Sequence, residues 1–391
     1  MLIEIDFWEL LTINKNKVFQ NADIKFLIDS EGKFKKPQMK IGDYELTIDD
    51  NSKLSQGGFG KVFLYRNKED SKFILKWSKL SSDYFVFDEY DINFIFNNLS
   101  LILHNFENKK YIFTPQILKI IYSENNIFMI SKFYNPSITL TYPDVNTINI
   151  DFNNIISLIY IISCKLDFLQ DKLKFNHNDL KLDNTVYYSK KNYIDFFFID
   201  LGSSRIEINN VVKYGNVESS TIGVQDKFVK SKDLFCLIHS ILMELKAYYN
   251  PLFVMFKKFL KLNLKLNINE DLIIYKNYKV LSQFDKNMYF NKYKDKVIDF
   301  DNIYDNDVYF ISYVLKDYDD SFSPNNIINL LLENNNNILN RETIELGQKY
   351  LNLKSKVKID NGENDDLIIG DEIMMDIDYF NNKKKYFIKY N

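Results

Sequence analysis

The pattern of apolar and polar positions divides the chain into a first part rich in short strands and a later part rich in long helices. From "YELTIDD" at residue 44 to "FILKW" at residue 77, short apolar runs alternate with Gly, Asn and Asp, which predicts an antiparallel sheet. A helix is predicted next, because residues spaced three and four apart share one helical face. The residues so spaced are Phe85, Glu89, Ile92, Phe96 and Leu99. The run "NIFMISKF" then predicts another buried strand.

Longer apolar segments follow, with the length and pattern of helices. "NNIISLIYIISCKLDFL" (residues 153–169) and "KDLFCLIHSILMEL" (residues 232–245) are apolar nearly all round, as helices buried on every side must be. A third helix is predicted in "SPNNIINLLLE", because Ser323 can cap it and Pro324 suits its first turn. The low-complexity run "ENNNNILN" after it predicts a loop.

This order of elements predicts an α+β fold with two lobes, a small one built on an antiparallel sheet and a larger, mostly helical one. We place the smaller lobe at residues 45–131 and the larger lobe at residues 132–350. Residues 1–44 form an N-terminal extension without a usable motif. Residues 351–391 are charged and end in "NNKKKYFIKYN", which predicts a solvated tail. The alternative is a segment that meets a membrane or an acidic partner.

Composition excludes several classes of protein. The chain has 391 residues, of which 46% are apolar and 16% aromatic, so it can bury a substantial core and is not globally disordered. The net charge of −3 mixes Lys with Asp and Glu, which gives no electrostatic footprint for nucleic acid. Only Arg66, Arg205 and Arg341 are arginines, a bias typical of an AT-rich genome. The abundance of Lys and Asn therefore says little about function.

Neither a disulfide framework nor a secretory or membrane segment is predicted. Cys164 and Cys236 each lie in an apolar run, so we expect two buried thiols rather than metal ligands. The N-terminus "MLIEIDFWELL" is acidic rather than basic, unlike a secretory signal. The longest uncharged run, residues 152–164, is too short to span a bilayer. We therefore expect a cytoplasmic protein, located in the host cytoplasm or the virion if the genome is viral.

The first stretch with chemistry is "LSQGGFGKVF", residues 54–63. Two strands joined by a glycine-rich turn can fold over a polyphosphate, because glycine lets backbone amides approach the oxygens. The alternative is an ordinary hairpin between exposed strands. In "FILKW", Ile74 and Lys76 point to one side of their strand and the other three residues to the opposite side. Lys76 could pair with phosphate while Ile74 packs on a base, although most lysines at strand ends are merely solvated.

Glu89 lies on the apolar stripe of the predicted helix, where a charge is costly unless it is paired. Lys76 is the obvious partner. The alternative is that Glu89 lies in water at the edge of the stripe, where Asp88 or Asp91 would serve equally well.

The stretch "HNDLKLDN", residues 177–184, combines groups that could transfer phosphate. Asp179 could orient a hydroxyl nucleophile and take its proton, and Lys181 could neutralise charge on the transferred phosphoryl group. Asn184 could bind a metal ion through its amide oxygen. Asp200 follows the apolar strand in "FFFIDLGSS", and with Asn184 it supplies the hard oxygen ligands that suit magnesium. Each piece alone has an ordinary explanation, but five such elements in one order are hard to attribute to chance.

In these motifs the chain resembles the protein-kinase superfamily. That family has a glycine-rich loop, a strand lysine, a helix glutamate, a catalytic loop and an Asp-Phe-Gly motif in this order. The resemblance covers residues 54–245, about half of the chain. It implies a two-lobed fold that holds ATP and Mg²⁺ between the lobes.

The resemblance also implies a role for each matching residue. Asp179 becomes the catalytic aspartate, Lys181 the contact to the γ phosphate, and Asn184 and Asp200 the magnesium ligands. Asp233 matches the aspartate that ties the buried central helix to the catalytic loop. The residues implied for ATP are Ser55, Gly57, Gly58 and Gly60 over the phosphates, Lys76 paired with Glu89 on the α and β phosphates, and Val62, Ile74 and Val186 around the adenine.

Several positions depart from the family pattern. Ser55 replaces the first loop glycine, and Leu201 replaces the phenylalanine of the magnesium motif but keeps its apolar role. The Ala-Pro-Glu motif is missing, with Glu218 a weak stand-in, so the surface that docks peptides has diverged. Asn178 replaces the arginine that receives an activation-loop phosphate in many family members. Because a neutral amide cannot make that charge-assisted pairing, we predict no switching by activation-loop phosphorylation through Asn178.

The resemblance implies transfer of the ATP γ phosphate to Ser or Thr hydroxyls of proteins that the sequence does not identify. Lys181 favours the serine/threonine class over the tyrosine class. Two alternatives stay open. His-Asn-Asp also occurs in small-molecule kinases of the choline-kinase and aminoglycoside-kinase type. The other alternative is a nucleotide-binding pseudokinase scaffold, because substrate docking has diverged, although Lys76, Asp179, Asn184 and Asp200 are all present.

Overall fold

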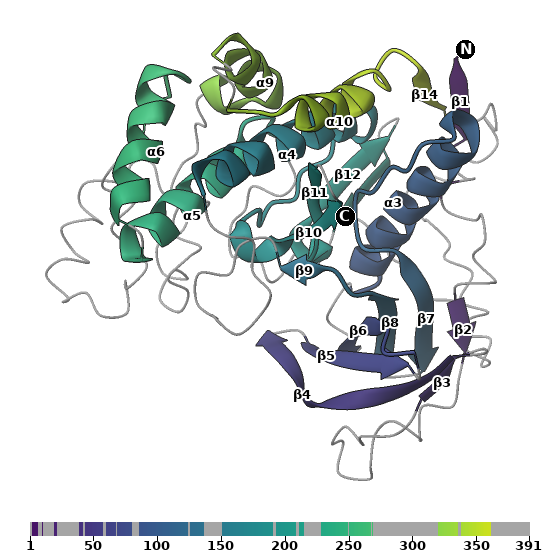
Figure 1. The fold of residues 1–391 in the computed structure, drawn as a ribbon. Helices are drawn as coiled ribbons and strands as arrows, with labels where there is room; N and C mark the ends of the chain where they lie inside the picture. Colours follow the sequence, from purple (N-terminus) through teal and green to yellow (C-terminus); the bar gives the residue numbers. More distant parts are fainter. Residues whose placement is uncertain are drawn as a thin grey trace, which may run out of the picture. The chain divides into compact units, whose positions relative to one another are not determined.

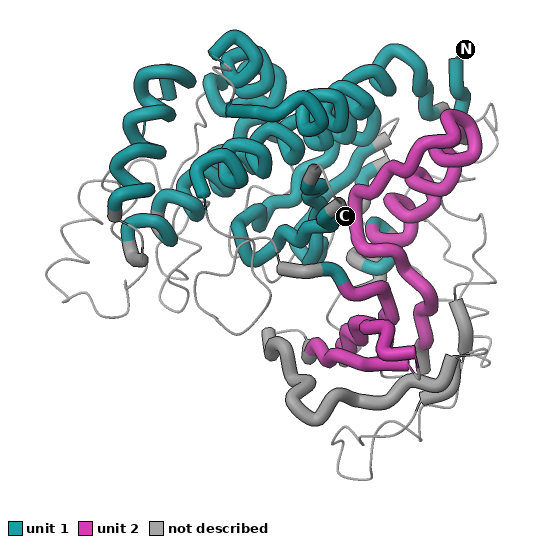
Figure 2. The backbone as a smooth tube through the Cα atoms, viewed as in Figure 1, with its two compact units in different colours: residues 1–4, 87–92, 134–359 teal, residues 5–86, 93–133, 360–391 magenta. Residues whose placement is uncertain are grey.

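The computed structural model combines helices with largely antiparallel sheets (Figure 1). The residues that it describes are 2–6, 10, 19–21, 39–41, 44–57, 60–67, 69–79, 86–123, 126–136, 151–190, 193–208, 211–214, 228–248, 250–266, 268, 320–334 and 338–360. The chain divides into two compact units that alternate along the sequence (Figure 2). Unit 1 comprises residues 1–4, 87–92 and 134–359, and unit 2 comprises residues 5–86, 93–133 and 360–391.

Unit 2 is built on a seven-stranded sheet with the order β2-β7-β8-β6-β5-β4-β3. All neighbouring strands are antiparallel except β2 and β7, which are parallel. The antiparallel sheet predicted for residues 44–77 is therefore confirmed. The strands are β2 Phe19–Asn21, β3 Met39–Ile41, β4 Tyr44–Gly57, β5 Gly60–Asn67, β6 Lys72–Lys79, β7 Ile117–Ser123 and β8 Asn126–Lys132.

One face of this sheet forms the apolar core of unit 2. Alternate residues of β5, β6 and β8 contribute to it, as the period of a half-buried strand requires. The ring of Trp77 packs against this core and stacks on Phe128, with ring centroids 6.3 Å apart. The buried members of the core are Phe63, Tyr65, Phe73, Leu75, Ile121, Phe128 and Ile130. Lys76 and Ile74 alternate with these residues, so they lie on the opposite face, as predicted from "FILKW".

Helix α3 extends over Val86–Glu107 and contributes residues to both units. Its predicted apolar stripe is confirmed, because Ile92, Phe96 and Leu99 are fully buried. Phe85 lies outside the described residues.

The described part of unit 1 contains long helices and small sheets of two or three strands. Its helices are α4 Phe152–Leu173, α5 Lys232–Tyr248, α6 Asn250–Leu262, α9 Pro324–Glu333 and α10 Arg341–Leu351. Its strands are β9 Asn135–Pro136, β10 Thr185–Lys190 and β11 Tyr193–Phe198 in one sheet, and β12 Arg205–Ile208 with β13 Val211–Tyr214 in another. The helix predicted from "SPNNIINLLLE" is confirmed with Pro324 in its first turn, but the Ser323 side chain makes no capping hydrogen bond.

Helices α4 and α5 are buried over most of their described residues, as their apolar sequences predict. Asp151 caps α4 by accepting a hydrogen bond from the Asn154 amide at 2.7 Å. Cys164 and Cys236 are buried free thiols, as predicted. By length and composition α4 could cross a membrane, although 72% of its apolar window is buried inside the protein. The core helix of a soluble protein meets the same criteria.

A buried lysine joins three elements of unit 1. The Lys165 ammonium on α4 lies 2.7 Å from the Asp195 carboxylate on β11 and donates to the Phe196 carbonyl at 2.5 Å. It also lies 4.8 Å from the centre of the Tyr350 ring on α10. A charge buried this deeply is tolerated only when it is paired and hydrogen-bonded, so this cluster fixes how α4, β11 and α10 pack.

Residues 351–360 are not part of a solvated tail, contrary to the prediction. Leu353 and Val357 are buried, and strand β14 Val357–Asp360 pairs with strand β1 Ile3–Asp6. The first strand of the chain thus belongs to a two-stranded sheet, although its sequence was assigned to an extension without a motif. The pairing joins segments more than 350 residues apart in sequence, which a local pattern cannot reveal.

Candidate functional site

The residues of "HNDLKLDN" form a loop between α4 and β10 in unit 1. Just before the loop, Asn176 pairs with Arg205 of β12 through two backbone hydrogen bonds of 2.9 and 2.8 Å. The loop ends in a short 3-10 helix, Leu182–Asn184, whose Leu182 amide donates to the Ser240 hydroxyl of α5 at 3.2 Å. The loop is therefore held at both ends by other elements of unit 1.

Asp233, in the first turn of α5, is the main anchor of this loop. Its carboxylate accepts hydrogen bonds from the His177 amide at 2.9 Å, the Asn178 amide at 3.0 Å and the Asn176 side chain at 3.1 Å. A carboxylate at a helix N-terminus is favoured by the helix dipole, and hydrogen bonds to a charged acceptor are strong. The tie between the central helix and the loop, which the family resemblance implied for Asp233, is thus present.

Asn176 adds a second tie, which the sequence gave no reason to expect. Its side-chain oxygen accepts from the Val229 amide and its side-chain nitrogen donates to the Val229 carbonyl, each at 2.8 Å. Fully buried Asn176 therefore fixes the backbone that leads into α5 against the loop.

The two carboxylate oxygens of Asp179 differ in their hydrogen bonds. Its Oδ2 atom accepts from the Lys181 ammonium at 3.2 Å and from the Asn184 side chain at 2.8 Å. Among the described residues nothing donates to Oδ1, and 17% of the side chain is exposed. Burial raises the pKa of Asp179, Lys181 lowers it, and the charge of Asp200 raises it further. Such a carboxylate can orient a hydroxyl and accept its proton.

Asp200 is held beside Asn184 by backbone hydrogen bonds. The Ile199 amide donates to the Asn184 carbonyl, and the His177 ring nitrogen Nε2 donates to the Ile199 carbonyl, each at 3.0 Å. Asp200 itself adopts a left-handed conformation, with φ 59°, and its side chain is exposed. Leu201, which follows it, is fully buried and keeps the apolar role expected at that position.

Asn184 and Asp200 fit a magnesium ion that is also coordinated by phosphate oxygens. The Asn184 side-chain nitrogen is used on Asp179, which leaves its amide oxygen for a cation. Mg²⁺ is commonly bound by one or two protein oxygens together with water and substrate phosphates. In the described part of the chain, no three His, Cys, Asp or Glu side chains form a metal-binding group. A metal held here would therefore complete its shell with phosphate and water.

The side chain of Asn178 connects two segments of the site. Asn178 adopts a left-handed conformation, with φ 64°. Its amide nitrogen donates to the Ser203 carbonyl, and its amide oxygen accepts from the Lys232 ammonium, each at 2.9 Å. Asn178 itself is neutral, but its side chain is hydrogen-bonded to the ammonium group of Lys232.

Three of the predicted nucleotide-binding residues lie on the face of the unit 2 sheet opposite the core, namely Val62, Ile74 and Lys76. Directly opposed residues of antiparallel strands share a face. Val62 on β5 is opposite Ser55 on β4 and Lys76 on β6, and Lys76 is opposite Met129 on β8. Ile74 lies two residues before Lys76 on the same face. Val62, Ile74 and Lys76 are half-buried, which leaves part of each accessible.

The glycine loop is described only at its two ends. Gly57 and Gly60 are paired across the tip of the β4–β5 hairpin, as a tight turn between two strands requires. Gly58 lies outside the described residues. So does the side chain of Glu89, although its backbone belongs to α3, and the predicted Lys76–Glu89 pairing stays a prediction. Val186 lies in unit 1, where it is buried on β10 opposite Phe197.

Two further residues of interest were missed from the sequence. Met129 was overlooked because it lies in an apolar strand, and only the register places it beside Lys76. Lys232 was overlooked because it precedes Asp233 and resembles any solvated residue at a helix start. The sequence did offer one signal, because Lys232 is a charged residue at the start of an otherwise apolar run. Glu218, and with it the divergent segment of residues 215–227, lies outside the described residues.

Comparison with known proteins gives a structural likeness but no match in sequence. No protein-family model and no curated protein matches it. Among solved structures it is similar to "Titin kinase and its flanking domains", with 13% identity and a TM-score of 0.40 over 80% of this chain. The chain spans about half the length of that protein chain, 51%. A likeness of this size carries no argument about activity.

Proposed function

We propose that this protein is an ATP-dependent phosphotransferase with a two-lobed, protein-kinase-like fold, and that it phosphorylates Ser or Thr residues of proteins. The observation that carries the proposal is the arrangement around Asp179. One of its carboxylate oxygens is held by Lys181 and Asn184, no described residue donates a hydrogen bond to the other, and the charge of Asp200 raises its pKa. A general base beside a cation and hard oxygen ligands is what phosphoryl transfer needs.

In this proposal each residue of the loop has a separate task. Asp179 orients the acceptor hydroxyl through Oδ1 and takes its proton as the new bond to phosphorus forms. Lys181 lies beside the carboxylate and neutralises charge on the transferred group. Asn184 and Asp200 would hold Mg²⁺, which supplies charge neutralisation at the β and γ phosphates. Positioning and charge neutralisation contribute more to the rate than proton removal does.

The nucleotide is assigned to the face of the unit 2 sheet that carries Lys76. The hairpin with Ser55, Gly57, Gly58 and Gly60 would cover the phosphates, and Lys76, paired with Glu89, would hold the α and β phosphates. The residues assigned to the adenine are Val62, Ile74 and Val186. Half-burial of Val62 and Ile74 supports this assignment, because an apolar surface that stays accessible suits a planar base.

Small-molecule acceptors of the choline and aminoglycoside type are the alternative, since His-Asn-Asp also occurs in such kinases. A scaffold that binds ATP without turnover is a second alternative. The cytoplasmic location, the protein acceptor and the absence of a nucleic-acid partner stay predictions from the sequence.

An acceptor panel tests the proposal. The protein is incubated with ATP labelled on its γ phosphate and Mg²⁺, in separate reactions with a generic basic protein, choline and aminoglycosides. We expect label on Ser and Thr of the protein, detected after acid hydrolysis, and none without Mg²⁺. Label only on the small molecules would overturn the assignment of a protein acceptor. ATP binding without any transfer would favour the scaffold.

A further inference from the structure

Lys232 is a buried lysine at an unfavourable place in the fold. It is the first residue of α5 and only 1% exposed. Burial of an ammonium group is costly, and a positive charge at a helix N-terminus is opposed by the helix dipole. A residue selected only to begin this helix would be neutral or acidic. We therefore expect a specific hydrogen-bond acceptor for the Lys232 ammonium.

The surroundings of Lys232 supply that acceptor from the catalytic loop. Its ammonium donates to the amide oxygen of Asn178 at 2.9 Å. Burial lowers the pKa of the Lys232 ammonium, and the negative charges of Asp233 and Asp179 oppose that effect. The two carboxylates that anchor the loop and carry its chemistry therefore favour the charged form of Lys232.

Through Asn178, the cation acts on both segments of the site. The other end of the Asn178 amide donates to the Ser203 carbonyl, in the turn that follows Asp200. Its backbone amide donates to Asp233. Asn178 immediately precedes Asp179, and its left-handed conformation sets the direction in which the chain enters that residue. Fixing the amide of Asn178 therefore fixes Asp179 relative to the turn that carries Asp200.

We propose that Lys232 is a positioning residue, whose ammonium group locks Asn178 between the catalytic loop and the 201–203 turn. The loop is then ordered without any phosphate on the segment between β13 and α5. This inference rests on the proposed phosphotransfer, because it explains how the loop that contains Asp179 is kept in position for that reaction.

Three substitutions at Lys232 test the role of its charge. Lys232→Met keeps the apolar stem and removes the ammonium. We expect kcat to fall by roughly 10- to 100-fold, with KM for ATP changed by less than about twofold, because the nucleotide residues are untouched. Lys232→Arg keeps the charge and should restore a large part of kcat. If Lys232→Met does not fold, Lys232→Gln replaces it, since glutamine still donates a hydrogen bond but carries no charge. A folded Lys232→Gln protein with wild-type kcat would overturn the inference.

A double-mutant cycle tests whether the charge acts through Asn178. Asn178→Ala alone should lower kcat to a similar extent as Lys232→Met. The double variant should be no more than about twofold slower than either single variant, because both remove the same interaction. Fully additive losses would contradict the inference.

Hydrogen exchange of the nucleotide-free protein separates this inference from the proposed function. In Lys232→Met, peptides covering residues 175–184 and 199–204 should exchange faster than in the wild type. The matched control is Lys165→Met combined with Asp195→Asn, which removes a second buried lysine together with its partner. It should lower the melting temperature but leave kcat and both peptides unchanged.

A failure of the proposed function can be distinguished from a failure of the positioning role of Lys232. If the wild type transfers no phosphate while Lys232→Met still loosens both peptides, the proposed function fails and the positioning role stands. If the wild type transfers phosphate and Lys232→Met changes neither kcat nor exchange, the positioning role fails.

Discussion

At the scale of single residues, Asp179 and Asp200 are two carboxylates in different surroundings. Asp179 is mostly enclosed and shares one oxygen with Lys181 and Asn184, whereas Asp200 is exposed at the end of a buried strand. Different surroundings allow two nearby acids to take different tasks. The enclosed one suits proton transfer, and the exposed one suits a hydrated cation.

The assignment of Asp200 to magnesium is testable by substitution. Asp200→Asn should raise the Mg²⁺ concentration for half-maximal stabilisation by ATP by about tenfold or more, because a charged oxygen ligand is lost. The melting temperature, measured with ATP at increasing Mg²⁺, gives this concentration without any need for turnover. Asp183→Asn is the matched control, since Asp183 is an exposed acid next to Asn184. An equal shift in both variants would show a general charge effect and contradict the assignment.

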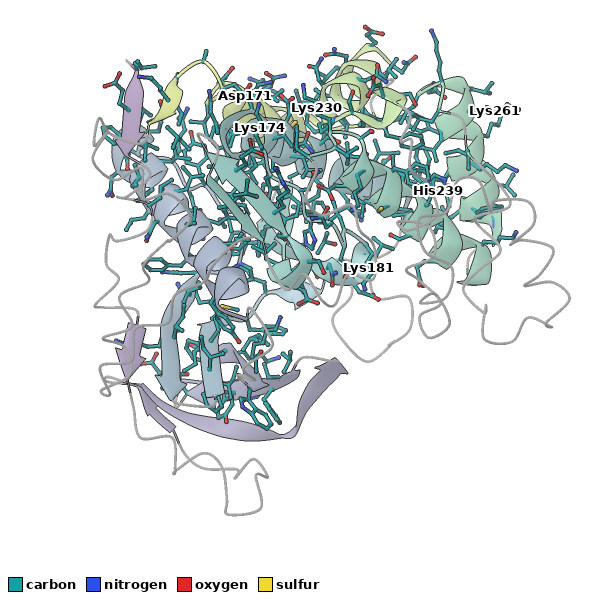
Figure 3. All side chains as sticks on the ribbon, turned by 180° about the vertical axis from the view of Figure 1, so that it is seen from behind. Asp171, Lys174, Lys181, Lys230, His239 and Lys261 are labelled. Carbon is teal, nitrogen blue, oxygen red and sulfur yellow. The ribbon has the colours of Figure 1, made fainter. Side chains whose placement is uncertain are left out.

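His239 predicts how stability depends on pH. Its ring is buried in α5 between Phe235 and Phe322, with its position marked in Figure 3. Burial lowers its pKa to about 4 from an ordinary value of 6.5. Below pH 6.5 the unfolded chain gains a proton that the folded protein excludes, so stability is lost as the pH falls from 6.5 towards 4.

The His239→Leu variant isolates this effect. Between pH 7.5 and pH 5.5 the wild type should lose about 1.4 kcal/mol more unfolding free energy than His239→Leu, the value of one pKa unit. Urea unfolding at the two pH values measures both losses, and every other titrating group contributes equally to the two proteins. Equal losses would show that His239 takes up a proton in the folded state.

At the scale of elements, the loop of residues 177–184 depends on α5 for its shape. It has little regular structure of its own, and its backbone amides and side chains are held by Asp233, Ser240 and Lys232. Asn176 ties the backbone before α5 to the same loop. The rigidity of the site is therefore a property of this helix as much as of the loop.

Removal of the charge of Asp233 tests this dependence. Asp233→Asn should lower the unfolding free energy by roughly 3 kcal/mol, because hydrogen bonds to a buried carboxylate are lost or weakened. It should also speed hydrogen exchange at the amides of His177 and Asn178. Asp183→Asn again provides an exposed comparison and should change stability by less than about 0.5 kcal/mol. If the two variants are equally stable, Asp233 does not anchor the loop.

Local patterns predicted the elements but not the distant pairings. Alternation in "FILKW" placed Lys76 and Ile74 opposite the core, and the stripe of α3 was correct at Ile92, Phe96 and Leu99. Strand β14 was missed because it is short, charged and paired with a strand at the other end of the chain. Lys232 was missed because its partner Asn178 is 54 residues away. Asn178 was correctly seen as neutral, but the cation beside it comes from another element.

At the scale of the whole molecule, the chain contains a helical unit with an ordered acidic site and a sheet unit with a glycine hairpin and a lysine. Lys181, labelled in Figure 3, and Asp179 belong to the first unit, and Lys76 belongs to the second. The loss of Asp179 should abolish transfer without abolishing ATP binding.

The most direct test measures phosphate transfer from γ-labelled ATP by wild type and Asp179→Asn, purified in parallel, with Mg²⁺ and a basic protein acceptor. We predict transfer by the wild type and a rate at least about 100-fold lower for Asp179→Asn, the range expected for loss of a general base. Stabilisation of both proteins by Mg-ATP should be similar. Transfer by Asp179→Asn at the wild-type rate, or no transfer by the wild type to any acceptor, would contradict the account.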